Sequence, residues 1–512
     1  FVTRSWGYWH SKDLLNWDFI TPEKWYFEGC NAPAAHNYKD SVLYVCGNPS
    51  GAMSILYTDN PKRGDWKAVP SVLHDLQDPA LFIDDDERAY MYWGSSNRWP
   101  IRGKELDMKN KFLPIAKKPD SLLFLRPDIH GWERFGENHT SDIKPFIEGA
   151  WMTKHNGKYY LQYAAPGTQF NVYGDGVYVG KSPLGPFEYA AHNPFCYKPG
   201  GFATGAGHGS TVCGPGGIYW HFGTIHLSIN YKFERRLCMF PTFFDEDGAM
   251  YSDTYFGDYP HYSPDQVSRQ TTSGGFRGWM LLSYGKPVKA SSKLESYPVE
   301  NVTDENLKTF WVAEKNDDKQ WVEIDLEEVS DVYALQLNFF DYEETGFWGR
   351  MPNLRQRYLV EASVDGARWR VLVDYRNSFR DAPHNYIELD QPIEARYIRY
   401  RHHYVPGKNL AMGDIRVFGL GRGKKPATVK GFTVVREADE RNARISWKAV
   451  KGAQGYNVLW GVALDKLYSS WMVYGDNSLD LRALTVGQKY YFAIEAFNEN
   501  GISQRVFLRE AH

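Results

Sequence analysis

Short hydrophobic runs separated by Gly, Pro, Asn and Asp fill the first half of the chain, and apolar residues there seldom recur with a helical period. Such runs predict β-strands. Four times, a polar turn carrying Gly or Asp precedes an aromatic strand, at 39–47, 86–94, 156–164 and 216–223. The copies follow one another at unequal spacings of about 45 to 70 residues. This irregular repeat predicts the blades of a β-propeller with inserted loops.

The second half of the chain shows a different pattern. Alternating hydrophobic and polar residues at 319–326, 358–372 and 395–405 are typical of a β-sandwich. A stretch rich in Gly, Lys and Pro at 419–431 indicates a linker. Beyond it, a Trp on an early strand and a Tyr-rich late strand favour a small immunoglobulin-like sandwich. We therefore expect an all-β chain of three domains, at 1–265, 280–421 and 425–512.

The composition excludes several classes of partner. The chain has 512 residues, with 59 Lys and Arg against 62 Asp and Glu, and a net charge of -3. This balance offers no electrostatic footprint for nucleic acid or an anionic membrane surface. No apolar run approaches the length of a membrane span. Aromatic residues make up 16% of the chain, which suits both large cores and sugar-binding surfaces. We expect a monomer.

Cysteine usage and the first residues say little about compartment. All five cysteines lie in the first half of the chain, without metal-ligand spacing, and their odd number favours buried free thiols over a disulfide framework. The chain begins at Phe1 with what looks like the middle of a strand, and carries no secretory signal there. We expect that residues preceding Phe1 are missing from this sequence.

The first candidate for chemistry is Asp78. It precedes Pro79 just ahead of an apolar strand, where a carboxylate can face the central channel of a propeller. The local pattern alone leaves a functional and a structural role equally open. The acidic run at 84–86, in the turn after the same strand, is typical of a solvated turn.

The second candidate is Glu148, which apolar and small residues flank from Ile147 to Trp151. An acid in such surroundings is costly to bury unless it is paired or protonated. Apolar surroundings raise the pKa of a carboxyl, which is how a general acid is made at neutral pH. The alternative is a glutamate satisfied by a salt bridge.

The third candidate is His208, which lies between two glycines that permit close backbone approach. A lone histidine is more often a satisfied core residue than a ligand, but its small neighbours favour a position near the axis of a propeller. Arg235 and Arg236 lie beyond it and could pair with the acids or belong to the ordinary surface.

Three motifs in this order, DPALFIDDD, IEGAWMTKHNGKYYLQYA and GHGSTV, resemble glycoside hydrolase family 43. That family uses five-bladed β-propellers and mostly removes arabinose or xylose from plant polysaccharides. The resemblance implies Glu148 as the general acid and Asp78 as the carboxylate that tunes and orients it. It implies His208 as a residue of the central channel, often near a calcium ion. Trp151 and Arg236 are candidate substrate contacts, and the sugar platform is sought among Trp6, Trp25, Trp93, Trp99 and Trp151.

One residue of the family pattern is missing. Inversion requires a base, an Asp in an Asp-Pro motif, whose place would be just upstream of Phe1. Asp13 and Asp18 lie in an outer turn and are poor substitutes. We expect that the chain has lost its first inner strand; a variant that lacks the usual base is the alternative.

The second unit resembles the discoidin (factor 5/8 C-type) fold shared with family 32 carbohydrate-binding modules, through NVTDENLKTFW, EASVDGARW and DIRVFG. The resemblance implies a structural calcium site, for which Asp304, Thr309 and Asp414 are the candidate ligands. His208 is a separate candidate metal ligand, in the propeller. The candidate sugar contacts of the second unit are Phe347, Trp348 and Tyr404. The last unit resembles fibronectin type III, and we expect it to act as a spacer.

These features favour a secreted, periplasmic or cell-surface inverting glycoside hydrolase. Its substrate would be an oligo- or polysaccharide carrying terminal arabinofuranosyl or xylosyl units, and the chemistry requires no cofactor. The alternative is an inactive glycan-binding propeller. A sialidase-type propeller is a poor alternative, because the only sequence like an Asp box, at 363–369, falls in the sandwich. A pure adhesion protein would not need Asp78 and Glu148 in these contexts.

Overall fold

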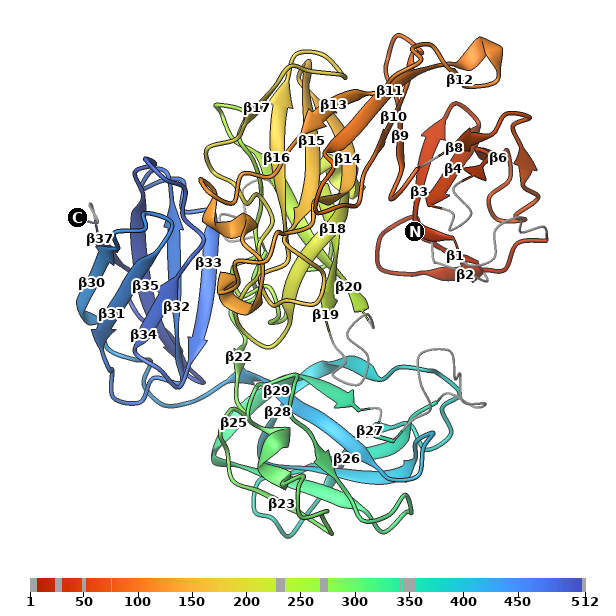
Figure 1. Ribbon diagram of the computed structural model, residues 1–512. Helices are drawn as coiled ribbons and strands as arrows, with labels where there is room; N and C mark the ends of the chain where they lie inside the picture. Colours follow the sequence, from red (N-terminus) through yellow and green to blue (C-terminus); the bar gives the residue numbers. More distant parts are fainter. Residues whose placement is uncertain are drawn as a thin grey trace.

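The computed structural model describes residues 7–23, 30–47, 52–74, 76–226, 235–267, 275–340, 342–343 and 355–508. Strands dominate these residues (Figure 1), and the helical elements among them are short 3-10 turns. These turns are η1 (Met108–Asn110), η2 (Gly131–Glu133), η3 (Glu137–His139), η4 (Pro215–Gly217) and η5 (Val299–Val302). Within the described part, no helix has the length and apolar character needed to cross a membrane. The predicted all-β class is confirmed.

Four antiparallel sheets build most of the first domain, and the four predicted aromatic runs lie on the second strand of each sheet. The sheets are β3 (Asn31–Tyr38), β4 (Ser41–Gly47), β6 (Leu56–Thr58) and β7 (Lys67–Ala68); β9 (Ala80–Ile83), β10 (Ala89–Trp93), β11 (Ile101–Asp107), β12 (Leu113–Pro114) and β13 (Asp120–Leu123); β14 (Glu148–His155), β15 (Lys158–Ala165), β16 (Gly174–Gly180) and β17 (Phe187–Tyr189); and β18 (Thr204–Cys213), β19 (Tyr219–His226), β20 (Arg235–Phe244) and β21 (Met250–Ser252). Two short pairs accompany them, β1 (Tyr8–His10) with β2 (Asp18–Ile20), and β5 (Ala52–Met53) with β8 (Leu73–His74).

The first strands of the four sheets line the propeller axis. Each of β3, β9, β14 and β18 is the edge strand of its sheet, and β9 contacts both β3 and β14, while β14 also contacts β18. Neighbouring sheets therefore meet through these inner strands. Residues at the start of each inner strand are brought to one end of a common channel.

The structure corrects the expectation of free cysteines in part. Cys30 and Cys46 form a disulfide, which links the entry of β3 to the end of β4. Cys196, Cys213 and Cys238 are free thiols. An odd number of cysteines is compatible with one disulfide, and a residue count carries no information about which strands lie side by side.

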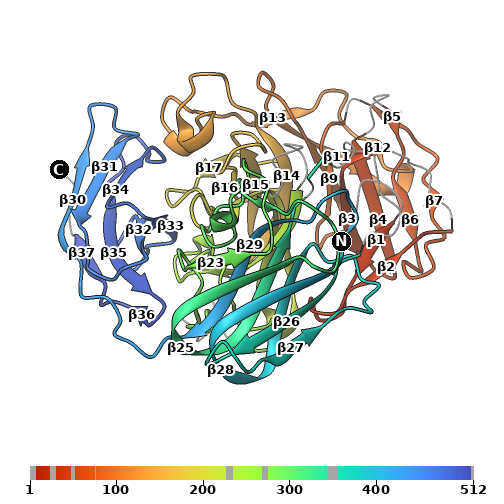
Figure 2. The same ribbon diagram turned by 90° about the horizontal axis from the view of Figure 1, so that it is seen from below.

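The second domain is a β-sandwich of eight strands in one hydrogen-bonded network. Two long strands, β25 and β28, pair with each other across two irregularities in register. The strands are β22 (Met280–Leu281), β23 (Val288–Ala290), β24 (Trp311–Val312), β25 (Trp321–Phe339), β26 (Arg357–Ser363), β27 (Arg370–Asp374), β28 (His384–Tyr404) and β29 (Ala411–Leu420). Seen from below, β25 and β28 lie across the propeller (Figure 2).

The third domain consists of two sheets. One contains β30 (Lys430–Arg436), β31 (Ala443–Lys448) and β34 (Ser478–Leu481); the other contains β32 (Gly455–Gly461), β33 (Ser469–Tyr474), β35 (Tyr491–Asn498), β36 (Gly501–Ile502) and β37 (Val506–Leu508). Its core is continuous with that of the propeller, because Trp460 and Trp471 pack against Tyr197. Arg134 donates hydrogen bonds to Asn442 and to the Arg482 carbonyl, both at 2.6 Å. The third domain, which we expected to act as a spacer, thus packs directly against the propeller.

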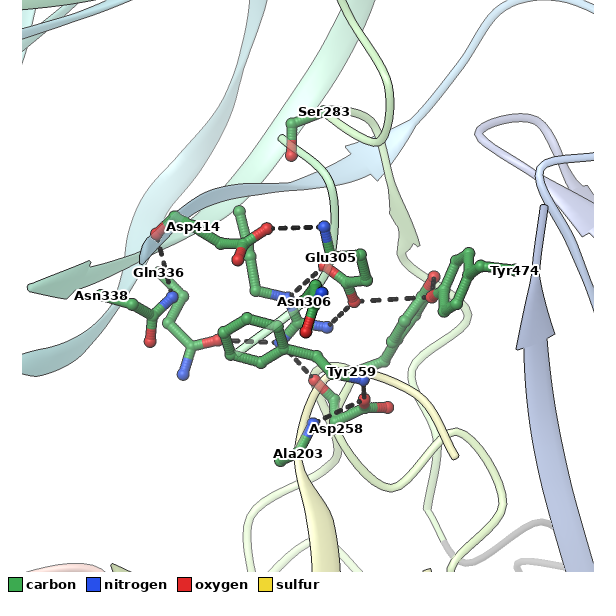
Figure 3. Close-up of polar contacts among 12 residues, drawn as sticks. Ala203, Asp258, Tyr259, Ser283, Glu305, Asn306, Gln336, Asn338, Asp414 and Tyr474 are labelled. Carbon is green, nitrogen blue, oxygen red and sulfur yellow. Dashed lines mark hydrogen bonds and ion pairs between the residues drawn. The ribbon is translucent and has the colours of Figure 1, made fainter. Parts of the chain in front are cut away.

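A buried polar network joins the three domains (Figure 3). The Arg416 guanidinium holds both carboxylate oxygens of Glu305, at 2.6 and 3.0 Å, and also donates to the Asp258 carbonyl of the propeller segment at 2.8 Å. Tyr474 of the third domain donates to Glu305 at 3.5 Å and lies 2.7 Å from the Tyr259 hydroxyl. The network fixes the second domain against both of its neighbours.

The burial of Glu133 predicts that the stability of the folded chain depends on pH. Glu133 is fully buried in η2, where Tyr163 donates to one carboxyl oxygen at 2.6 Å, and burial raises its pKa from 4.5 to about 8. The folded chain therefore holds a proton that the unfolded chain releases between these two values. The stability of the wild-type chain should fall by on the order of a few kcal/mol as the pH rises through that window. Glu133→Gln should flatten this loss.

The measurement is the unfolding midpoint in denaturant from pH 5 to pH 9. Glu246→Gln, at an exposed carboxylate of the same domain, is the control and should keep the wild-type slope. An equal pH slope for Glu133→Gln and the wild type would contradict the assignment.

Candidate active site

Asp78, Glu148 and His208 meet at the end of the channel where the inner strands begin. Asp78 lies two residues before β9, Glu148 is the first residue of β14, and His208 lies in the first half of β18. One ligand atom from each side chain lies within 4.8 Å of the others, and His208 Nδ1 is 3.9 Å from the Asp78 carboxylate. All three side chains are partly exposed. The sequence prediction grouped the same three residues.

Two hydroxyl groups hold the Glu148 carboxyl in place. The Tyr173 phenol donates to Oε1 at 2.5 Å, and the Ser95 hydroxyl donates to Oε2 at 3.1 Å. Because a hydroxyl can both donate and accept, these contacts suit a protonated as well as an ionised carboxyl. The alternative of a glutamate satisfied by a salt bridge is not favoured, since these two partners of Glu148 are neutral hydroxyls.

His208 is positioned through its backbone by a buried carboxylate. Asp175, on β16, accepts the backbone N–H groups of His208 at 2.9 Å and Gly209 at 2.8 Å. The same carboxylate accepts from His221 Nε2 at 2.8 Å. Sequence reasoning missed Asp175, although its place between two glycines in GDGVYVG marks a strand that another backbone approaches closely.

The backbone of the site adopts conformations that most residues avoid. Asp78 has a φ of 49° and His208 one of 54°, in the left-handed region. Gly149 has a φ of 64°, and a Cβ there would lie 2.9 Å from the His208 ring. A glycine is therefore required at position 149, next to Glu148. Strained non-glycine residues such as Asp78 and His208 cluster at functional sites.

The predicted aromatic contacts have different surroundings. Trp151 is partly buried, and its indole N–H donates to the Thr211 carbonyl of β18 at 3.1 Å. Trp93 is buried in the core. Trp99 is 63% exposed, on the segment that also supplies Ser95 to Glu148. Trp6 and Trp25 lie outside the described residues.

The acidic turn at 84–86 is more than a solvated loop. Asp84 is buried, and its carboxylate accepts hydrogen bonds from Lys154 and Tyr159 of the next sheet. Its pKa stays below the ordinary value in spite of burial, because these donors stabilise the charge. Asp84 therefore ties two blades together.

The remaining predicted residues lie away from this cluster. Arg236 is on β20 and lines a cavity between the propeller and the second domain. Asp304, Thr309 and Asp414 lie in the second domain, where the Thr309 hydroxyl donates to Asp304 at 2.6 Å and Asp414 accepts the Glu305 N–H at 2.8 Å. Phe347 and Trp348 lie outside the described residues. The Tyr404 ring has the Arg355 guanidinium 5.4 Å from its centroid.

Two curated relatives resemble part of the chain. A beta-xylosidase of Xylanibacter ruminicola is 33% identical over 133 residues, which cover 22% of this chain and 39% of that protein. An arabinoxylan arabinofuranohydrolase of Bacillus subtilis (strain 168) is 30% identical over 189 residues, covering 32% of this chain and 34% of that protein. The chain thus spans less than half the length of these relatives.

Comparison with solved structures and with family sequence models covers more of the chain. A structure named glycoside hydrolase, 20% identical, covers 80% of this chain and 89% of its own, with a TM-score of 0.43. Residues 2–250 match the sequence model of glycosyl hydrolases family 43, and residues 287–412 match that of the F5/8 type C domain. The chain therefore carries a domain of glycosyl hydrolase family 43 followed by an F5/8 type C domain.

Proposed function

We propose that the first domain is an inverting glycoside hydrolase that removes terminal arabinofuranosyl or xylosyl units from plant-type polysaccharide. The observation that supports this most directly is the convergence of Asp78, Glu148 and His208 at one end of the channel. The names of the two relatives, a beta-xylosidase and an arabinoxylan arabinofuranohydrolase, agree with this substrate class. The F5/8 type C domain would bind the same polysaccharide.

Glu148 is the general acid in this proposal. Its proton passes to the glycosidic oxygen as the bond to the sugar breaks, and the hydroxyls of Ser95 and Tyr173 orient the carboxyl for that transfer. Asp78, whose carboxylate lies in the same cluster, orients the acid in this proposal. His208 would contact the sugar or a cation through water.

Inversion also requires a base that activates water on the opposite face of the sugar, with the two carboxyls roughly 6.5 to 9.5 Å apart. Asp13 does not suit this role, because the backbone N–H groups of Leu15 and Asn16 occupy its carboxylate in an outer turn. Asp78 is already committed to the acid. In this proposal the base is therefore a carboxylate other than Asp78 and Glu148.

The exposed Trp99 is a better sugar platform than Trp151. An aromatic face stacks on a sugar ring only when it is open to the ligand. Trp99 is 63% exposed beside the segment that holds Glu148, whereas the Trp151 indole N–H is held by Thr211. Trp151 stays a secondary candidate for a sugar contact.

A secreted, periplasmic or cell-surface location is part of the proposal. The disulfide between Cys30 and Cys46 supports it, because such bonds persist mainly in oxidising compartments. We also assign the third domain to the fibronectin type III class. Its pairing of β30, β31 and β34 in one sheet, opposite β33, β32 and β35 in the other, supports this assignment.

A calcium ion in the second domain is a further proposal. Calcium prefers oxygen ligands from carboxylates and hydroxyls. Asp304 and Thr309 supply such oxygens side by side, and the buried Oδ2 of Asp414 has no hydrogen-bond partner in the described structure. An unpaired buried carboxylate oxygen fits a cation site, and a bound ion would supply the compensating charge. The imidazole of His208 is not a ligand type that calcium favours.

The general acid is tested with 4-nitrophenyl α-L-arabinofuranoside and β-D-xyloside. Glu148→Gln should lower kcat by roughly 10²- to 10⁴-fold, because the amide has no proton to donate. Glu188→Gln, at an exposed carboxylate of the same blade, should keep wild-type turnover. Equal rates for Glu148→Gln and the wild type would refute the assignment. A wild-type chain that binds arabinoxylan but turns over neither substrate would favour the inactive glycan-binding alternative.

The platform is tested by Trp99→Ala. Loss of a stacked aromatic ring should raise KM about tenfold with little change in kcat. Trp369→Ala, on the second domain, is the matched control and should leave both constants unchanged for these small substrates. An unchanged KM for Trp99→Ala would place the platform elsewhere.

The calcium proposal predicts that chelation lowers the melting temperature and that added calcium restores it. At a calcium concentration of 100 times Kd, the stabilisation should be about 2.7 kcal/mol. Asp304→Asn should abolish the response, whereas Asp390→Asn, at an exposed surface position, should retain it. A wild-type melting temperature that ignores both chelator and calcium would contradict the site.

A further inference from the structure

A cavity of about 590 Å³ lies between the propeller and the second domain. Its propeller wall includes β20 and the segment at 257–261, and its other wall is formed by β25, β28 and β29. The volume falls within the range of small-molecule sites, which occur preferentially where domains meet. Asp78, Glu148 and His208 are not among its lining residues.

The second-domain wall is one continuous sheet face. Gln336 pairs with both Tyr386 and Arg416, and Asn338 pairs with His384. Directly paired residues of an antiparallel sheet lie on the same face, and so do residues two apart on one strand. An amide pair, an imidazole, a phenol and a guanidinium are thereby presented together to the cavity.

The propeller wall leads to the candidate active site. Ile225 pairs with Arg236 on one side and with Gly205 on the other, and Gly205 lies three residues before His208 on β18. Three residues of strand extend about 10 Å, and two strand spacings add a similar distance across the sheet. The cavity and His208 therefore lie at the same end of the same blade.

The chemistry of the walls suits a neutral polyhydroxylated ligand. Amide groups exchange hydrogen bonds with hydroxyls, and the rings of Tyr386 and Phe240 offer apolar faces to a sugar. The charge of Arg416 is offset by Glu305, and that of Lys198 by Asp258 at 3.5 Å. Burial also lowers the pKa of His384 to about 3, which keeps this imidazole uncharged.

We propose that this interdomain cavity is a second carbohydrate site, which holds a neutral sugar unit of the same polysaccharide chain whose terminal unit lies at Glu148. The inference rests on the proposed function for the identity of the ligand. It gives the second domain a direct part in substrate selection, because neither wall forms the site alone. Oligosaccharides that reach both places should bind better than single sugars.

Tyr386→Ala tests the site, because Tyr386 is 43% exposed and its hydroxyl donates to Glu388, two residues along the same strand, at 3.2 Å. Binding of xylohexaose and of arabinoxylan oligosaccharides is measured by calorimetry in the Glu148→Gln background, where turnover should be at least about 100-fold slower. Tyr386→Ala should weaken binding about tenfold. Tyr397→Ala, on the same strand but outside the cavity, should bind as the parent does, and equal melting temperatures would verify the fold.

Three results would overturn the proposal. These are an unchanged affinity for Tyr386→Ala, an equal loss for Tyr397→Ala, or tighter Tyr386-dependent binding of oligogalacturonate than of the neutral oligosaccharides. Failure of the proposed hydrolase is seen separately, as absent turnover of the nitrophenyl glycosides. Tyr386-dependent binding of xylohexaose would uphold the cavity even then.

Discussion

The burial of Arg416 is the constraint on which the arrangement of the domains depends. A guanidinium shielded from water is costly unless its donors are paired, and here they meet Glu305, Gln336 and the Asp258 carbonyl. The rings of Phe202 and Phe418 lie 4.4 and 4.8 Å from the guanidinium carbon. Since these partners come from two domains, the second domain cannot turn relative to the propeller without exposing an unpaired charge.

The same rule governs the candidate active site on a smaller scale. Asp175 is a buried carboxylate whose three donors come from β18 and β19, and satisfying it fixes the backbone at His208. Thr211 extends the network, through hydrogen bonds of 2.9 Å to His221 and to Gln162 of β15. The last two blades are thus locked together by polar groups, and Asp175 connects them to the cluster through the backbone of His208. A site held in this way keeps its geometry without relying on the substrate.

The sequence was sufficient for features whose signal is local. Asp78, Glu148 and His208 each stand in a short sequence motif, and the inner strands of the blades bring the three together. Tyr173 and Asp175 were not predicted, because their roles depend on which strand of one sheet faces another, and no local sequence pattern carries that information. The disulfide of Cys30 and the shared core of the third domain escaped for the same reason, since both are contacts between segments that the chain pattern treats as separate.

The strained backbone at Asp78 and His208 is held in place by the blades around it. A left-handed conformation at a non-glycine residue costs about 1 to 2 kcal/mol, and Asp78 and His208 both adopt one. Neither residue offsets this cost by packing, because both side chains are only partly buried. The surrounding blades, tied by Asp84 to Lys154 and by Asp175 to His221, impose the conformation instead. Contacts elsewhere in the propeller thus hold two carboxylates and an imidazole in place, although the local backbone conformation is unfavourable.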